Sequence, residues 1–187
     1  MKIDRIYTRG GDSGATSLGD GTRVAKHSLR VRAMGSVDEA NAAIGVALAH
    51  AGRPEIAPVL LRIQNDLFDL GADLCVPESG DPKHSRLRIA AAQTEALERE
   101  IDRINDGLSA LTSFVLPGGS IASAHLHLAR TITRRAEAEV AALAAAESLN
   151  PELLKYLNRL SDLLFVLARQ ANDNGAADVL WQPGLNR

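Results

Sequence analysis

The chain has 187 residues, 45% of them hydrophobic and 24% charged, and a formal net charge of -2. This length supports one domain with a substantial core, and the near-neutral charge with scattered basic residues disfavours a nucleic-acid-binding surface. A single cysteine, Cys75, allows no internal disulfide and no thiolate metal cluster. No apolar run approaches the roughly 20 residues that span a bilayer. We therefore expect a cytoplasmic protein that binds neither nucleic acid nor membrane.

The first 32 residues are rich in glycine and polar side chains and show no helical period. Residues 8–18 combine glycines, which let backbone amides converge, with hydroxyls and with Asp12, an acid suited to a magnesium shell. Phosphate binding is one interpretation of this stretch, and a plain flexible arm is the other. A Walker loop is excluded, because aspartate and glycine follow Gly19 where lysine and a hydroxyl residue are required.

The first two helices are predicted from capping residues and apolar repeats. Ser36 opens a capping box of sequence Ser-Val-Asp-Glu, which predicts a helix from Ser36 to about residue 51. A second helix should begin near Pro54 or Pro58, since proline is tolerated in a first turn, and Pro77 should end it.

The third and fourth helices follow an irregular stretch. Residues 78–88 have no period and predict an exposed loop, after which residues 91–105 place apolar side chains at helical spacing. Ser120 or Ser123 can cap a long fourth helix that continues to about residue 146.

The fifth helix is predicted after Asn150, a good N-cap that proline follows, and a polar tail completes the chain. No alternating strand pattern of useful length is present, so we expect an all-α fold of five antiparallel helices. One domain would then comprise residues 1–187: a loop segment at 1–32, a helical bundle at 36–173 and a tail at 174–187.

Three basic residues lie on the otherwise apolar fourth helix. Arg130, Arg134 and Glu137 fall at i, i+4 and i+7 and share one face, whereas Arg135 is turned roughly 100° away from Arg134. A solvated helix face is one explanation. The surrounding alanines and leucines leave little of the helix for plain solvent, and this favours an anion-binding stripe.

Other polar residues could complete such a site. Lys26 and Asp38 could contribute charges, and Asn158 interrupts the leucines of the fifth helix. A buried amide there needs partners to avoid a penalty of about 1–3 kcal/mol, so it serves either structure or ligand binding. His125 and His127 point to nearly opposite sides of a helix, which indicates packing or surface roles and no metal site.

Together these motifs resemble the PduO-type ATP:cob(I)alamin adenosyltransferases, a family of helical bundles, and the likeness spans almost the whole chain. One departure is Gly10, which stands where the family usually has a threonine before the loop glycine. The resemblance is carried by residues 8–18, 35–39, Asn41, 44–45, 64–71, 114–119, the arginine stripe and residues 156–162.

The resemblance implies a ferritin-like five-helix bundle that assembles as a homotrimer, with ATP between subunits. The N-terminal loop of one subunit and the arginine helix of its neighbour would hold the nucleotide. By carry-over, the ATP-binding residues would be Thr8, Arg9, Gly11, Asp12, Gly14, Thr16, Ser17, Lys26, Arg134, Glu137 and Asn158. The catalytic residues would be Arg130, Arg134, Asp38 and Phe114, with Asp38 paired to Arg130 across the interface and Phe114 near the corrin.

The implied reaction is attack of cob(I)alamin on the 5′ carbon of ATP, which gives adenosylcobalamin and triphosphate. Mg²⁺ would enter mainly through the ATP phosphates, and a reductase and an adenosylcobalamin-dependent acceptor enzyme would be partners. An alternative is a non-catalytic nucleotide-binding regulator or adenosylcobalamin delivery protein of the same fold. A helical scaffold without a ligand would leave the glycine-rich loop, the arginine stripe and Asn158 unexplained.

Overall fold

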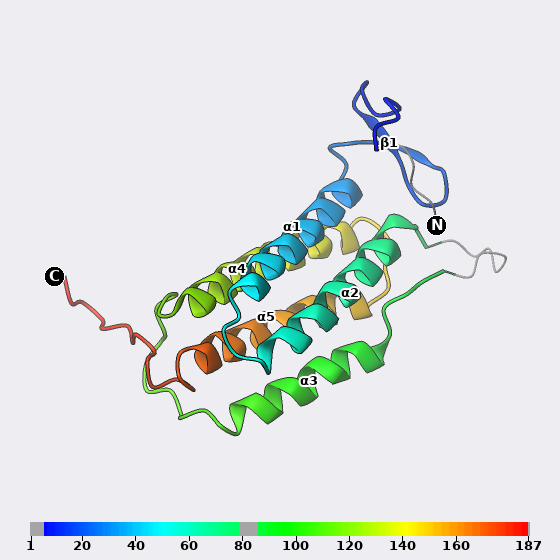
Figure 1. Ribbon diagram of the computed structural model, residues 1–187. Coiled ribbons are helices and arrows are strands. Elements are labelled where there is room, and N and C mark those ends of the chain that lie inside the picture. Colours follow the sequence, from blue (N-terminus) through cyan, green and yellow to red (C-terminus); the bar gives the residue numbers. More distant parts are fainter. Residues whose placement is uncertain (1–5, 79–85, 187) are drawn as a thin grey trace.

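The computed structural model in Figure 1 describes residues 6–78 and 86–186 and contains five helices and two short strands. All five predicted helices are confirmed, and most of the loop predicted at 78–88 lies outside the described residues. In chain order the elements are β1 (Ala15–Ser17), β2 (Arg23–Ala25), α1 (Leu29–Ala49), α2 (Ile56–Cys75), α3 (Ala91–Asn105), α4 (Ile121–Ala144) and α5 (Glu152–Ala171).

Each helix runs opposite in direction to the one before it, and the helices pack side by side (Figure 1). Helix α1 packs against α2 and α4, and α5 packs against α3 and α4. The leucines that repeat along α5 are completely buried, because that helix is covered by neighbours on both sides. Among the helices described, none is long and apolar enough to cross a membrane.

Helix α1 begins seven residues earlier than predicted, and the capping box at Ser36 was wrong. Ser28 is the N-cap instead, and its hydroxyl accepts a hydrogen bond from the amide of Val31 at 3.5 Å. Ala33 and Val37 are buried against the core at helical spacing, so tertiary packing continues the helix N-terminal to the local capping signal. Glu39, the box acid, forms an ion pair with Arg135 of α4.

The Ser120 cap predicted for α4 is confirmed, whereas α5 begins one residue later than predicted, with Pro151 and not Asn150 at the N-cap position. The Ser120 hydroxyl accepts a hydrogen bond from the Ser123 amide at 3.1 Å at the start of α4. The side-chain oxygen of Asn150 accepts from the Glu152 amide at 3.1 Å at the start of α5. Both contacts are local, and this is why the sequence alone could specify them.

A small sheet that the sequence prediction missed precedes α1. Strands β1 and β2 pair antiparallel, with Thr16 opposite Val24, and form a hairpin whose turn contains Gly21 at φ +87°. The Thr22 amide donates to the Asp20 carboxylate across this turn at 2.9 Å. Strands of three residues are too short to show a period of two in the sequence, so the prediction of an all-α fold needs this correction.

Candidate functional site

The N-terminal hairpin brings the predicted phosphate-binding residues together. The Lys26 amide donates to the Gly14 carbonyl at 2.9 Å, and the Lys26 side chain crosses the backbone at Gly11. A Cβ added to Gly11 would lie 2.9 Å from Lys26 Nζ, so glycine at this position permits the close approach of the ammonium group. The cation and the loop backbone thus form one surface on which an anion can bind.

Tight turns shape the rest of the loop. Arg9 has φ +58° and Gly14 has φ +82°, and the Gly14 amide donates to the Gly11 carbonyl at 3.2 Å. Asp12 is exposed at the tip of this loop. The other predicted ATP-binding residues of the hairpin are exposed or half-buried, and they are Thr8, Thr16 and Ser17.

Two features of the hairpin were not foreseen from the sequence. Arg23 spans it and donates to the Gly10 carbonyl at 2.9 Å and to the Ser17 hydroxyl at 3.3 Å. Among the described residues, a Cβ added at Gly10 would meet Thr8 Oγ1 alone, at 3.8 Å, so their packing does not require glycine there. The only sequence signal for Arg23 is its position six residues after Ser17, which has no meaning until the hairpin is known.

A cavity of about 600 Å³ opens between α4 and α5, and Arg134, Glu137, Lys155 and Asn158 line it. Arg134 is exposed and has no hydrogen bond or ion pair within residues 6–78 and 86–186. Lys155, by contrast, pairs with Glu152 at 2.7 Å. Arg134 is therefore the cation of this cavity that is available to an incoming anion.

Asn158 is held by a chain of polar contacts along the wall of the same cavity. Its amide nitrogen donates to Glu137 at 2.9 Å, and its oxygen accepts from Arg159 at 2.5 Å. Arg159 also donates to Glu98 of α3 at 2.8 Å. Because both ends of the Asn158 amide are bonded, its orientation is fixed before any ligand arrives.

A second cavity, of about 640 Å³, lies at the other end of the arginine stripe, and Arg130, Phe114, Phe165 and Trp181 line it. Arg130 is half-buried with its Nε unpartnered in the described structure, and burial, followed by the charge of Arg134, lowers its guanidinium pKa. The Phe114 side chain is 76% exposed, and its ring centre is 5.9 Å from that of Trp181. The second cavity therefore combines aromatic side chains with the guanidinium group of Arg130.

Trp181 was assigned to a polar tail from the sequence, but in the structure its side chain lines this second cavity. The Trp181 amide donates to the Phe114 carbonyl at 2.7 Å, and the Leu116 amide donates to the Val179 carbonyl at 2.8 Å. An isolated bridge between Val115 and Leu180 joins the same segments. Only this long-range pairing distinguishes Trp181 from any other residue of a tail.

Asp38 lies away from both cavities. It is exposed on α1 and lines a hollow of about 540 Å³ between α1 and α2, with Phe68 and Asn41 among its neighbours. The hairpin also lies apart, beyond the N-terminal end of α1 (Figure 1). A single chain therefore presents the predicted site residues on separate surfaces: the hairpin, the α1–α2 face and two α4–α5 cavities.

His125 and His127 have the packing or surface roles that were predicted for them. His127 is buried against Phe165, with ring centres 6.0 Å apart, and His125 stacks on His50 at 5.0 Å. Within the described residues, no group of three or more histidine, cysteine or acidic side chains could hold a metal ion.

Comparison with known proteins identifies the family of this chain. Residues 6–171 match the family model described as cobalamin adenosyltransferase. The chain is 56% identical over its whole length to a corrinoid adenosyltransferase of Mycobacterium bovis, covering 97% of that protein. It is 48% identical to a cobalamin adenosyltransferase of Cupriavidus metallidurans, over 97% of this chain and 96% of that protein.

Solved structures agree with the sequence comparisons. A variant PduO-type ATP:corrinoid adenosyltransferase from Lactobacillus reuteri, complexed with cobalamin and ATP, superposes with a TM-score of 0.89 at 37% identity. The match covers 95% of this chain and 99% of that one. A second variant from the same organism, complexed with ATP, gives a TM-score of 0.86 at 38% identity, covering 95% of this chain and 100% of that one. This chain therefore belongs to the cobalamin adenosyltransferase family.

Proposed function

We propose that this protein transfers the 5′-deoxyadenosyl group of ATP to the cobalt of cob(I)alamin and releases triphosphate. The observation that carries the proposal is 56% identity to a corrinoid adenosyltransferase over the whole chain. The free arginine beside an oriented amide, and the lysine held against a glycine-rich loop, support it because a polyphosphate leaving group needs such donors.

The chemistry requires no general base. The electron pair of cob(I)alamin forms the bond from cobalt to the 5′ carbon while the bond from that carbon to oxygen breaks, and its electrons leave with triphosphate. Lys26 and the amides near Gly11 and Gly14 would bind the phosphates, and Arg134 would stabilise the charge that develops on the leaving oxygen. A well-placed donor of this kind contributes about 3 kcal/mol to the transition state.

Magnesium would enter with the nucleotide and be held mainly by its phosphates, where it would neutralise charge. The exposed carboxylate of Asp12 at the tip of the hairpin suits the outer part of such a shell.

We infer that the active unit is a homotrimer of ferritin-like bundles, and that the remaining residues 1–32 and 174–187 belong to one domain with the bundle. The hairpin and Arg134 serve one nucleotide only if they come from different subunits, because they occupy separate surfaces of a chain. Asp38 has no ion pair among the residues that the structure describes and lies on a face that exposes 72% of Phe68, and an ion pair with a neighbour's Arg130 would cover both.

The corrin would occupy the cavity beside Phe114 and Arg130. Its apolar wall suits the face of a macrocycle, and the exposed phenyl ring would disfavour a ligand on the lower side of cobalt. A reductase would supply cob(I)alamin, and an adenosylcobalamin-dependent enzyme would receive the product.

A spectrum tests the proposal. The protein is incubated with cobalamin, a strong chemical reductant, magnesium and ATP, and the appearance of the alkylcobalamin spectrum with release of triphosphate is the expected result. A spectral change on binding without triphosphate release would contradict an enzyme and support the regulator or delivery protein of the same fold. Sedimentation of the ATP-bound protein as a trimer would support the proposed assembly.

A further inference from the structure

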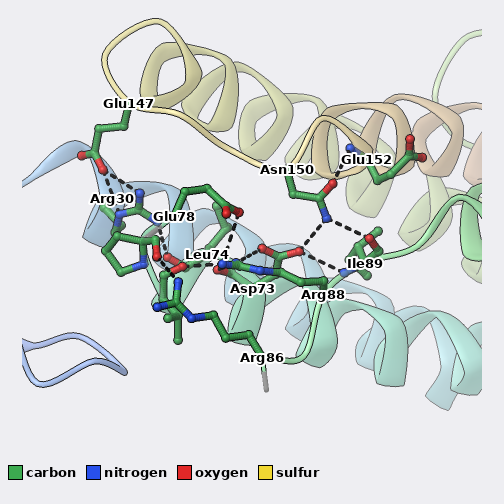
Figure 2. A network of polar contacts seen from close by, with 12 residues as sticks. Arg30, Asp73, Leu74, Glu78, Arg86, Arg88, Ile89, Glu147, Asn150 and Glu152 are labelled. Atoms are coloured by element: carbon green, nitrogen blue, oxygen red, sulfur yellow. Dashed lines mark hydrogen bonds and ion pairs between the residues drawn. The ribbon is translucent and has the colours of Figure 1, made fainter. Parts of the chain in front are cut away.

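The hairpin meets the bundle at the C-terminal end of α2. The last carbonyls of a helix have no partners within it and must find them elsewhere. Here they bind residues from distant parts of the chain: the Leu74 carbonyl accepts from Arg30 at 2.6 Å, and the Cys75 carbonyl accepts from the Gly19 amide at 2.9 Å. Arg88 donates to the Val76 carbonyl at 3.2 Å (Figure 2).

Arg30 provides the first of the two attachments. Its side chain is 3% exposed, lies in the first turn of α1, and binds Glu147 at 2.6 Å as well as the Leu74 carbonyl. Figure 2 shows the guanidinium between these two partners. A cation at a helix C-terminus is favourable because it faces the negative end of the helix dipole. Arg30 therefore fixes the start of α1, and with it the base of the hairpin.

Gly19 provides the second attachment, in the turn between β1 and β2. A Cβ added at Gly19 would lie 2.7 Å from Val76 Cγ2 and 3.4 Å from the Cys75 carbonyl oxygen. Carbon atoms pack at about 3.5–4.0 Å, so a Cβ at Gly19 would displace the turn or the Val76 side chain against it by about 1 Å. Glycine is needed at this position for close approach of the backbone, and not for an unusual φ.

A hairpin of two three-residue strands has too few contacts to hold its own orientation. The two attachments hold the turn and the base, and leave the loop with Gly11 and Lys26 projecting. We propose that Gly19 and Arg30 are positioning residues, which seat the hairpin on the end of α2 and thereby set the affinity for ATP. This inference rests on the proposed function, because it assumes that the hairpin binds the triphosphate.

The test compares Gly19→Ala, Val76→Ala and the double variant in the full-length protein. Gly19→Ala should raise the Kd and KM for ATP about tenfold or more, since a displacement of about 1 Å is costly for positioning. The KM for cob(I)alamin and the Tm should stay near the wild-type values. Val76→Ala alone should bind ATP normally, and the double variant should recover because the clashing methyl group is gone.

Arg30→Lys is the second variant, and it should weaken ATP binding while leaving the KM for cob(I)alamin unchanged. The inference is overturned if Gly19→Ala binds ATP normally, or if its KM values for ATP and cob(I)alamin rise together. It is also overturned if the double variant with Val76→Ala does not recover the affinity for ATP. Failure of the proposed function can be distinguished from failure of this inference, because the wild-type protein would then form no adenosylcobalamin. Calorimetric titration with ATP alone measures the affinity independently of turnover.

Discussion

Arg134 offers the sharpest test of the active site, because the structure separates its effect on chemistry from its effect on folding. The side chain is exposed and has no partner in the part of the chain that the structure describes. Replacing it by alanine should change the free energy of unfolding by less than about 0.5 kcal/mol. For a domain of this size, that corresponds to a Tm shift of less than about 2 °C.

The expected loss of catalysis is far larger. If Arg134 faces the departing triphosphate, its removal costs about 3 kcal/mol in the transition state, which lowers kcat about a hundredfold or more. Arg134→Lys should retain part of the rate, because an ammonium keeps the charge but loses the planar pair of donors. The assay follows adenosylcobalamin formation spectrophotometrically, with the oligomeric state checked by sedimentation.

Arg99→Ala is the matched control, since it removes an equal charge from a helix surface. The Arg99 side chain is 69% exposed on α3 and, within residues 6–78 and 86–186, pairs with Glu95 alone, at 3.8 Å, so its loss should leave turnover unchanged. Near-normal adenosylcobalamin formation by Arg134→Ala would refute the assignment. An equal loss in both variants would instead show a general electrostatic effect.

Three further predictions concern pairing and stability. Asp38→Ala and Arg130→Ala should each lower turnover. If the two residues pair across subunits, the double variant should lose no more turnover than either single variant, and fully additive losses would contradict the pairing. Asp73→Ala should lower the free energy of unfolding by about 3 kcal/mol, and therefore the Tm by about 6–12 °C, because the buried carboxylate accepts hydrogen bonds from the Ile89 amide and from Asn150. A Tm shift below about 2 °C would refute this. Burial, and then the charge of Arg130, lower the pKa of His127 below its usual 6.5, against a weaker opposing effect of Asp178. The unfolded chain therefore takes up a proton near pH 6.5 that the folded protein refuses, so stability should fall as pH drops below about 6.5, and His127→Leu should show a smaller fall in Tm between pH 7 and 5.

The sequence by itself determined the features that depend on neighbours along the chain. The leucines of α5 repeat at helical spacing, and the side-chain contacts of Ser120 and Asn150 act within one turn, so these elements followed from local pattern. The spacing of Arg130 and Arg134 likewise fixed their common helix face. The blocks of residues that resemble the family supplied the function, which periodicity could not.

Tertiary structure decided what depends on contacts between distant segments. Helix α1 starts at Leu29, with Ala33 and Val37 packed in the core, although the residues at Ser36 have the sequence of a capping box. The hairpin lies against the end of α2 because the Gly19 amide reaches the Cys75 carbonyl, and Trp181 joins a cavity because the tail pairs with Phe114. Such contacts combine side chains that have no fixed spacing in the sequence, so no local period records them, and they become visible only when the packed chain brings them together.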